Sequence, residues 1–224
     1  MKLLKILLPI FLLYGSSYAI NTENLQKDIN YIQKKWAYIK YEIPNKDEQV
    51  KEFEKLIKNS YQIIKKYPNT AEPKIWSAII ISTQAGIKGG FSALSLIKES
   101  KKLLQSAEKI NPTALNGSIY TSLGSLYYKA PGWPISFGDN DKAREYLEKG
   151  VKINPNGIDI NYFYGDFLQT KGEYKKALVI LNHALKSKPR KNRPLADKGR
   201  IKEIKELIIE VKEMLDSENE DGNY

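Results

Sequence analysis

Four prolines that follow helical stretches constrain the fold of this chain more than any other feature. They are spaced 44, 43 and 34 residues apart, at Pro68, Pro112, Pro155 and Pro189. Proline lacks the backbone N–H that a helix interior needs, so each one marks the end of a helix. Regular ends of this kind predict a repeated pair of helices, with insertions that lengthen the two earlier units.

The final unit, residues 155–189, has the pattern of two closely packed helices. Small residues let the helices approach each other, and larger residues fill the seam between them. The small set is Gly165, Ala177 and Ala184, and the large set is Tyr164, Leu168 and Leu181. A single unit of this size cannot bury its own apolar faces, so it requires neighbouring units.

These spacings resemble the tetratricopeptide repeat (TPR), a helix–turn–helix unit of 34 residues. The resemblance covers roughly residues 70–190, and it implies an all-α, right-handed solenoid of antiparallel helix pairs. We expect the chain to divide into a helical hairpin over residues 20–70, repeats over 71–112, 113–155 and 156–189, a basic linker with an amphipathic capping helix over 190–215, and a disordered acidic tail over 216–224.

The first nineteen residues have the pattern of a secretory signal peptide. Lys2 and Lys5 precede an apolar run of nine residues, and a small-x-small cleavage site ends at Ala19. The run is shorter than the roughly 20 apolar residues that span a bilayer, which argues against a retained anchor. The absence of cysteine excludes a lipoprotein anchor. We therefore expect cleavage after Ala19, no transmembrane span in the mature chain, and a periplasmic location.

The sequence offers little for catalysis or metal binding. No cysteine is present, and His183 is the single histidine, so thiolate chemistry and histidine-rich metal sites are excluded. Asp139 and Asp141 follow Gly138 but lack the later ligands of a calcium loop, and we interpret one of them as a helix N-cap. We predict no enzyme activity, no catalytic residue, no metal and no cofactor.

A binding surface is better supported. In TPR solenoids the first helix of each pair lines a concave groove, and the consensus register places polar side chains of both charge signs there. Such a groove suits a peptide or an extended polar ligand. The candidate residues on this face are Lys74, Ser77, Gln84, Ser118, Thr121, Ser125, Tyr128, Lys129, Asp159, Tyr162, Asp166 and Gln169.

An insertion at residues 130–138 separates the two helices of the middle repeat. It contains Trp133 and Phe137, whose rings are costly to leave in water, and prolines flank Trp133. The simpler expectation is that the aromatic side chains pack back over their own hairpin as a lid. The alternative is that they project as an anchor for a partner. Both residues are binding candidates.

The chain is basic, with a formal net charge of +10. Residues 186–200 alone hold seven Lys or Arg residues and one Asp. We interpret this stretch as a solvated linker, with contact to an anionic surface as the alternative. An exported chain has little access to nucleic acid, so we expect no nucleic-acid partner.

A narrower resemblance rests on residues 130–139, 158–165 and 193–197. These segments look like exported bacterial TPR proteins that are similar to the periplasmic T-component proteins of tripartite TRAP-type solute transporters. T-components bind a substrate-binding protein and are often lipoproteins, whereas this chain lacks the lipidation cysteine. We expect a non-catalytic module that binds an envelope protein or peptide. The alternative is a solute-handling accessory that holds a small ligand under the Trp133 loop.

Overall fold

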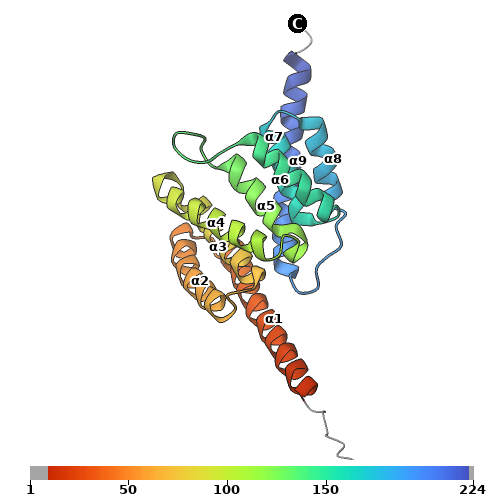
Figure 1. Ribbon diagram of the computed structural model, residues 1–224. Coiled ribbons are helices and arrows are strands. Elements are labelled where there is room, and N and C mark those ends of the chain that lie inside the picture. Colours follow the sequence, from red (N-terminus) through yellow and green to blue (C-terminus); the bar gives the residue numbers. More distant parts are fainter. Residues whose placement is uncertain (1–9, 222–224) are drawn as a thin grey trace, which may run out of the picture.

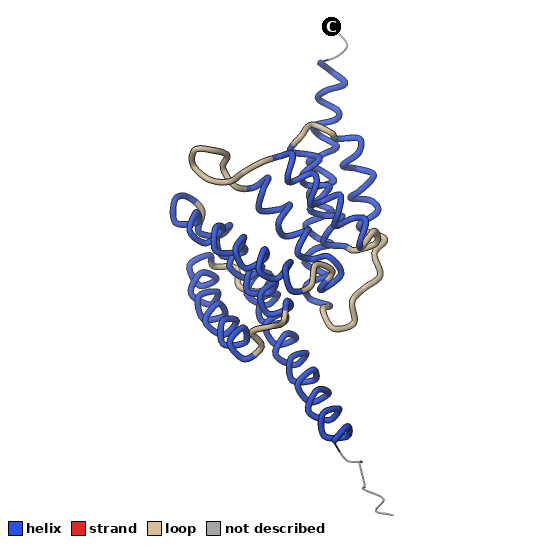
Figure 2. The backbone as a smooth tube through the Cα atoms, viewed as in Figure 1, coloured by secondary structure: helices blue, strands red, loops and turns tan. Residues whose placement is uncertain are grey.

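The protein is built from helices that pack in sequence-adjacent pairs (Figures 1 and 2). The computed structural model describes the backbone of residues 10–221 and the side chains of residues 22–218. Its helices are α1 (Ile10–Glu42), α2 (Lys46–Lys66), α3 (Ala71–Lys88), α4 (Gly90–Ile110), α5 (Ala114–Lys129), α6 (Asn140–Ile153), α7 (Ile158–Thr170), α8 (Tyr174–Ala184) and α9 (Pro194–Asp221). The prediction of an all-α fold of helix pairs is confirmed.

The odd-numbered helices form a closed inner layer. Helix α1 contacts α3, α3 contacts α5, α5 contacts α7, α7 contacts α9, and α9 returns to contact α1. The even-numbered helices α2, α4, α6 and α8 pack against their neighbours in this layer. We call the five odd-numbered helices the inner ring. Closure of the ring was not expected from the sequence, which predicts a capped but open groove.

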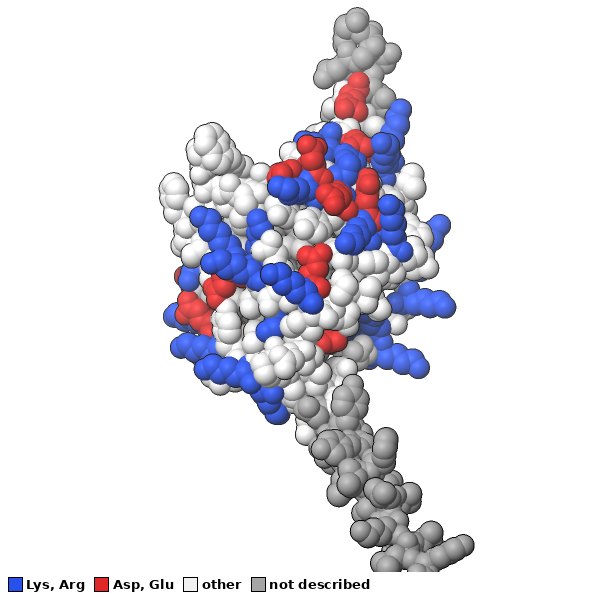
Figure 3. Space-filling model, viewed as in Figure 1, with Lys and Arg blue, Asp and Glu red and all other residues white. Residues whose placement is uncertain are grey.

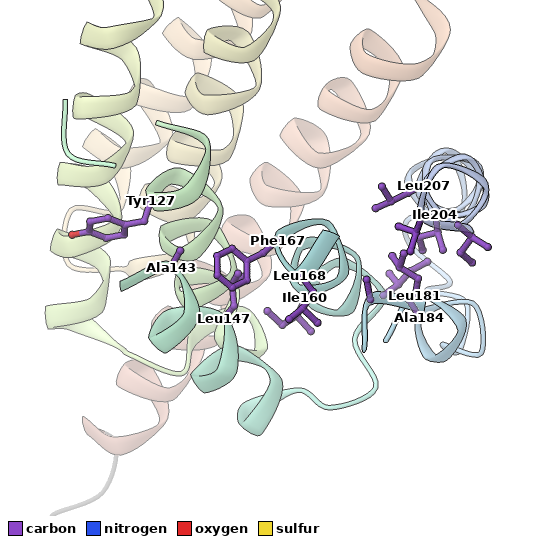
Figure 4. Close-up of a cluster of buried hydrophobic side chains, with 14 residues drawn as sticks. Tyr127, Ala143, Leu147, Ile160, Phe167, Leu168, Leu181, Ala184, Ile204 and Leu207 are labelled. Carbon is purple, nitrogen blue, oxygen red and sulfur yellow. The ribbon is translucent and has the colours of Figure 1, made fainter. Parts of the chain in front are cut away.

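Three clusters of buried side chains form the core of the described part of the chain. One joins α1, α2 and α3, one joins α3, α4 and α5, and the largest runs from α5 to α9. Figure 4 shows the largest cluster, in which Phe167 and Leu168 of α7 lie between side chains of α6 and α8. The seam predicted for the final repeat is confirmed, because Ala177 and Ala184 are fully buried and a Cβ on Gly165 would lie 2.6 Å from Leu181.

The turns between helices follow local rules. Asp139 is the N-cap of α6 and accepts hydrogen bonds from the backbone amides of Asp141 (3.1 Å) and Lys142 (3.0 Å). The N-cap interpretation is thus confirmed for Asp139. Gly89 and Gly90 join α3 to α4 with φ of +62° and +58°, a conformation that residues with a Cβ rarely adopt.

Helix α9 does more than cap one end of the array. Its side chains Ile204, Leu207 and Val211 belong to the core cluster of α5 to α9, whereas Ala196 belongs to the cluster of α1 to α3. The helix also continues to Asp221, beyond residue 215, where the capping helix was expected to end.

The structure describes only part of the predicted signal peptide, namely the backbone of residues 10–19. Residues 1–9 are not described, and the described backbone of α1 begins at Ile10. Across residues 10–221, none of the helices has the length and apolar character needed to cross a membrane. The side chains that the structure places in the α1 core begin at Leu25, so cleavage after Ala19 would leave those contacts in place.

Two glycine substitutions should change stability in opposite directions. In Gly165→Ala the new methyl overlaps the buried Leu181 side chain, and we expect the free energy of unfolding to fall by about 1–2 kcal/mol. In the control Gly86→Ala the methyl meets nothing within 4 Å, and we expect a gain of up to about 1 kcal/mol from helix propensity. Urea denaturation followed by circular dichroism measures both. Equal changes in the free energy of unfolding for the two substitutions would contradict the close packing of α7 against α8.

Candidate functional site

A cavity of about 790 Å³ lies inside the inner ring. Helices α1, α3, α5, α7 and α9 all contribute to its lining, together with the end of α8 and the loop of residues 186–193. We call it the ring cavity. Its volume is within the range of sites that bury a small molecule or a few residues of peptide.

One wall of the ring cavity carries hydroxyl groups from α3 and α5. Two of these hydroxyls are held by their own helix, because Ser82 and Thr83 both donate to the carbonyl oxygen of Ile79 (3.0 and 2.7 Å). Thr83 also accepts a hydrogen bond from Trp36 Nε1 (2.9 Å), which fixes the indole in the wall. The hydroxyl residues of this wall are Ser82, Thr83, Ser118, Thr121, Ser122 and Ser125.

Another part of the ring cavity is built around the carboxylate of Asp159. Arg190 Nη1 and Arg200 Nε donate to its two oxygens at 2.7 and 2.9 Å, and Arg193 Nη1 lies 3.7 Å away. Burial alone would raise the pKa of Asp159. The charges of Arg200, Arg190 and Arg193 outweigh it and hold this pKa well below its ordinary value. Asp159 is therefore the counter-ion of three arginines.

A second set of ion pairs joins α9 to α1. Glu203 accepts from Arg200 Nη1 (2.7 Å) and Tyr41 Oη (3.2 Å), and Lys40 Nζ lies 2.8 Å from its other oxygen. Burial and the nearby charge of Arg200 lower the pKa of Lys40 to about 8, against the opposing effect of Glu203. The helices come this close because Gly199 of α9 faces the Tyr41 ring with no room for a Cβ.

The backbone is strained at the rim of the ring cavity. Leu115, Asn116 and Gly117 form one left-handed turn at the start of α5, with φ of +51°, +53° and +77°. Two of the three are not glycine, and such conformations concentrate where a structure holds a segment in place for binding. Leu115 and Asn116 both line the cavity.

A second hollow of about 780 Å³ adjoins the ring cavity, and we call it the outer hollow. The two share lining residues from α1, α3, α5, α7 and α9, among them Lys40, Thr83 and Arg200. The outer hollow extends to apolar side chains of α4 and of the 130–138 loop, namely Phe91, Leu94, Ile97 and Ile135. In Figure 3 the tips of this loop and of the α3–α4 turn, at the upper left, are free of charged side chains.

The 130–138 loop is closed at its base and exposed at its tip. Gly138 donates its N–H to the carbonyl oxygen of Pro131 (2.8 Å). Phe137 packs edge-on against Tyr127, with ring centroids 5.5 Å apart. Trp133, in contrast, is 89% exposed. The expectation that the aromatic side chains pack back therefore holds for Phe137 and is wrong for Trp133, because the closed base leaves the tip no surface to cover.

The structure brings some of the predicted groove residues together and separates others. Thr121 and Asp159 line the ring cavity, and Lys129 and Tyr162 line the outer hollow. Ser77 and Gln84 were expected on the groove but are buried on another face of α3. There Gln84 donates to the carbonyl oxygen of Val50 in α2 (3.1 Å).

Most predicted charges are already satisfied within the protein. Asp166 accepts hydrogen bonds from Tyr128 Oη and Lys129 Nζ, both at 2.7 Å, so this carboxylate is not free to bind a ligand. Gln169 and Phe137 lie outside the linings of both cavities. Fewer of the predicted polar residues are therefore available to a ligand than the consensus register suggested.

The strongest cationic features of the site were missed by sequence reasoning. Lys40 lies in the hairpin predicted over residues 20–70, where no site residue was expected, and Arg190, Arg193 and Arg200 lie in the stretch that we interpreted as a solvated linker. The side chain of Arg200 is only 4% exposed and that of Arg193 13%. The available signal was that these three positions hold arginine and not lysine, since arginine is the more common cation in buried ion pairs.

Comparison with known proteins agrees with this architecture. Residues 135–197 match the family model of the tetratricopeptide repeat. A crystal structure of a thermophilic TPR protein from Thermus thermophilus superimposes with a TM-score of 0.53 at 13% sequence identity, covering 85% of this chain and 98% of that chain. The fold is TPR-like. Residues 135–197 are similar to the TPR, a class of repeat that typically binds proteins or peptides on its concave surface.

Two other solved structures are more distantly similar. YrrB, described as a TPR protein with an unusual peptide-binding site, is 17% identical with a TM-score of 0.42, covering 75% of this chain and 80% of that chain. The pilF protein of Pseudomonas aeruginosa is 14% identical with a TM-score of 0.35, covering 84% and 90%. No curated protein matches this chain. The resemblance to TRAP T-components stays a prediction.

The carboxylate of Asp159 should be essential to the site. In Asp159→Asn three arginines lose their shared counter-ion, so we expect the free energy of unfolding to fall. The loss should be about 2–3 kcal/mol, less than for a fully buried group, because the Asp159 side chain is partly exposed. The matched control Asp166→Asn removes the ion pair with the half-exposed Lys129 but keeps an oxygen that can accept from Tyr128 Oη, and we expect a loss below about 1 kcal/mol. Urea denaturation at pH 7 compares them. Similar losses would show that the arginine cluster does not depend on Asp159.

Proposed function

We propose that this protein is an exported, non-catalytic TPR module that binds a peptide or a protein segment of the cell envelope. The observation that carries the proposal is the pair of exposed aromatic side chains at the outer hollow. Phe91 and Trp133 are 87% and 89% exposed, more than any other large apolar side chain among residues 22–218. Phe91 lines the hollow, and Trp133 stands two residues before Ile135, which also lines it.

Exposed aromatic side chains beside a hollow have the character of binding anchors. Aromatic residues dominate the energy of many interfaces because they bury a large apolar area with few rotatable bonds. The outer hollow offers an apolar rim, and the adjoining ring cavity offers hydroxyl and cationic groups. A bound chain segment would place an apolar side chain at the rim and extend its polar backbone toward the ring.

A peptide-display selection tests this proposal. We expect the immobilised protein to enrich peptides with a shared apolar position, and the double variant Phe91→Ser, Trp133→Ser to bind them at least about tenfold more weakly. The matched control is Val179→Ser, Ile209→Ser, which removes two exposed apolar side chains from α8 and α9, outside the linings of both cavities. Equal loss in both variants, or no enrichment at all, would reject binding at the outer hollow.

Export rests on the sequence of the first nineteen residues. We expect mass spectrometry of the protein recovered from an envelope fraction to give a chain that starts at Ile20. A variant with Ala19→Arg should keep its full length, because cleavage requires a small residue at this position. Recovery of the uncleaved wild-type chain would favour a retained anchor.

A second candidate function is supported by the closure of the inner ring. A cavity of about 790 Å³ lined by five helices suits a small ligand as well as a peptide end. In this alternative the protein is a periplasmic solute-handling accessory, and the ligand occupies the ring cavity instead of the space under the Trp133 loop.

A further inference from the structure

The exposed part of the ring-cavity lining consists of polar side chains. Six of the lining residues are exposed, and we call them the cavity mouth: Asn116, Asn156, His183, Lys186, Lys188 and Asn192. They come from four separate places in the chain, namely the left-handed turn of α5, the turn before α7, the end of α8 and the loop before α9. None of the six is apolar or acidic, so the mouth differs from the apolar rim of the outer hollow.

Most side chains of the cavity mouth are free to bind a ligand. Among residues 22–218, neither Lys186 nor Lys188 is in an ion pair, and the side chains of the three asparagines make no hydrogen bond. His183 is the exception, because its Nε2 lies 3.0 Å from the carbonyl oxygen of Pro155. Ammonium and amide groups both donate hydrogen bonds, so the mouth is rich in free donors.

The charge balance of the whole lining is strongly positive. The lining cations are Lys40, Lys186, Lys188, Arg190, Arg193 and Arg200. Their ion-pair partners within residues 22–218 are the three carboxylates of Asp159, Asp197 and Glu203. Three of the six positive charges are therefore not compensated, and the two mouth lysines account for two of them. An excess of this kind in a cavity attracts anions.

This excess fits a ligand with two negative charges better than a ligand with one. A carboxylate brings a single charge, whereas a phosphate monoester brings about −1.5 to −2 at pH 7 and three oxygens that accept hydrogen bonds. Lys186 and Lys188 are two residues apart in the same loop, and the flexible lysine stems allow both ammonium groups to reach one phosphate. The mouth therefore favours a phosphate group.

The hydroxyl groups of α3 and α5 suit a different part of a ligand. Ser82 and Ser118 donate to carbonyl oxygens of their own helices and keep lone pairs that can accept from a ligand. The hydroxyls of Thr121 and Ser122 have no partner among the described residues, and neither is sealed from the solvent. A wall whose groups both donate and accept fits a ligand that carries several hydroxyl groups.

We propose that the ring cavity binds a phosphate monoester of a polyhydroxylated ring, as in a hexose phosphate. The phosphate is held by Lys186 and Lys188 at the mouth, and the ring hydroxyls contact the wall of α3 and α5. A cavity of about 790 Å³ is large enough for such a molecule. Asn116 connects the two parts, because it is exposed at the mouth and belongs to the strained first turn of the α5 wall.

The inference rests on the second candidate function, a ligand held in the ring cavity, and names the chemical class of that ligand. It does not depend on peptide binding at the outer hollow, so the two can fail separately. The double variant Phe91→Ser, Trp133→Ser should lose the selected peptides and still bind the sugar phosphate with unchanged affinity.

Calorimetric titration of the unaltered protein is the test, with glucose 6-phosphate, glucose, inorganic phosphate and glucuronate as probes. We expect glucose 6-phosphate to bind at least about tenfold more tightly than each of the others, because only this probe supplies both a phosphate and the ring hydroxyls. Equal binding of glucuronate would overturn the choice of phosphate. Equal binding of inorganic phosphate would overturn the role of the hydroxyl wall, and no binding of any probe would overturn the site.

A pair of charge-matched variants locates the phosphate. Lys186→Gln, Lys188→Gln should weaken binding of glucose 6-phosphate by about tenfold or more. The control Lys152→Gln, Lys191→Gln removes the same charge from two exposed lysines outside the cavity lining, and we expect a change of less than about twofold. Equal losses would show only long-range attraction by a basic protein and would overturn the assignment.

Two further variants test the contact with the ring. Ser122→Ala should weaken binding of glucose 6-phosphate by about threefold or more and leave the binding of inorganic phosphate unchanged, because it removes one hydroxyl of the wall. Asn116→Gly removes the mouth amide while glycine keeps the left-handed backbone, and it should weaken both ligands. Thermal melting checks folding, and if the double lysine variant is unfolded, unchanged binding in Asn116→Gly would reject the site.

A vesicle experiment distinguishes a free sugar phosphate from a lipid headgroup of the same chemistry. The probe is co-sedimentation with phosphatidylcholine vesicles that contain phosphatidylinositol 4-phosphate. Binding that free glucose 6-phosphate displaces supports a lipid headgroup, whereas no vesicle binding by a protein that binds the free compound supports the free compound. Vesicle binding that glucose 6-phosphate does not displace would reject the lipid as the source, because the contact then lies outside the ring cavity.

Discussion

The ion pairs between Asp159 and the arginines that surround it hold the inner ring together. Arg190, Arg193 and Arg200 come from the loop before α9 and from α9 itself, and Asp159 is in the first turn of α7. Three like charges within one cavity repel each other unless a carboxylate compensates them. Because the same arginine, Arg200, also pairs with Glu203 beside Lys40 of α1, the cluster connects α7, α9 and α1.

The two hollows on the concave side of the molecule differ in chemical character. Its ring cavity combines hydroxyl groups, two tryptophans and several lysines and arginines, whereas its outer hollow ends in apolar side chains of α4 and the 130–138 loop. The two share a wall, so one extended ligand could satisfy both. For the peptide of the proposed function, this difference gives a direction of binding, with an apolar side chain at the rim and the polar backbone toward the ring.

Local sequence signals predicted the helix pairs well and the site only in part. The closing prolines and the small residues Gly165, Ala177 and Ala184 act between neighbours in sequence, and the structure agrees with them. Ser77 was expected in the groove but is buried, and the face of α3 that lines the ring cavity carries Trp76, Ile79 and Thr83 instead. The burial of Arg200 depends on a contact with α7 about forty residues away, and no local pattern carries that information.

Closure of the ring changes how such an array can come apart. In an open stack of repeats each unit touches only its neighbours, so unfolding can begin at either end and spread inward. Here the first and last helices contact each other, and within residues 10–221 no terminal repeat has a free face in the inner layer. Loss of any one contact in the ring opens it without releasing a unit, which favours a cooperative, all-or-none response of the whole domain over fraying from its ends.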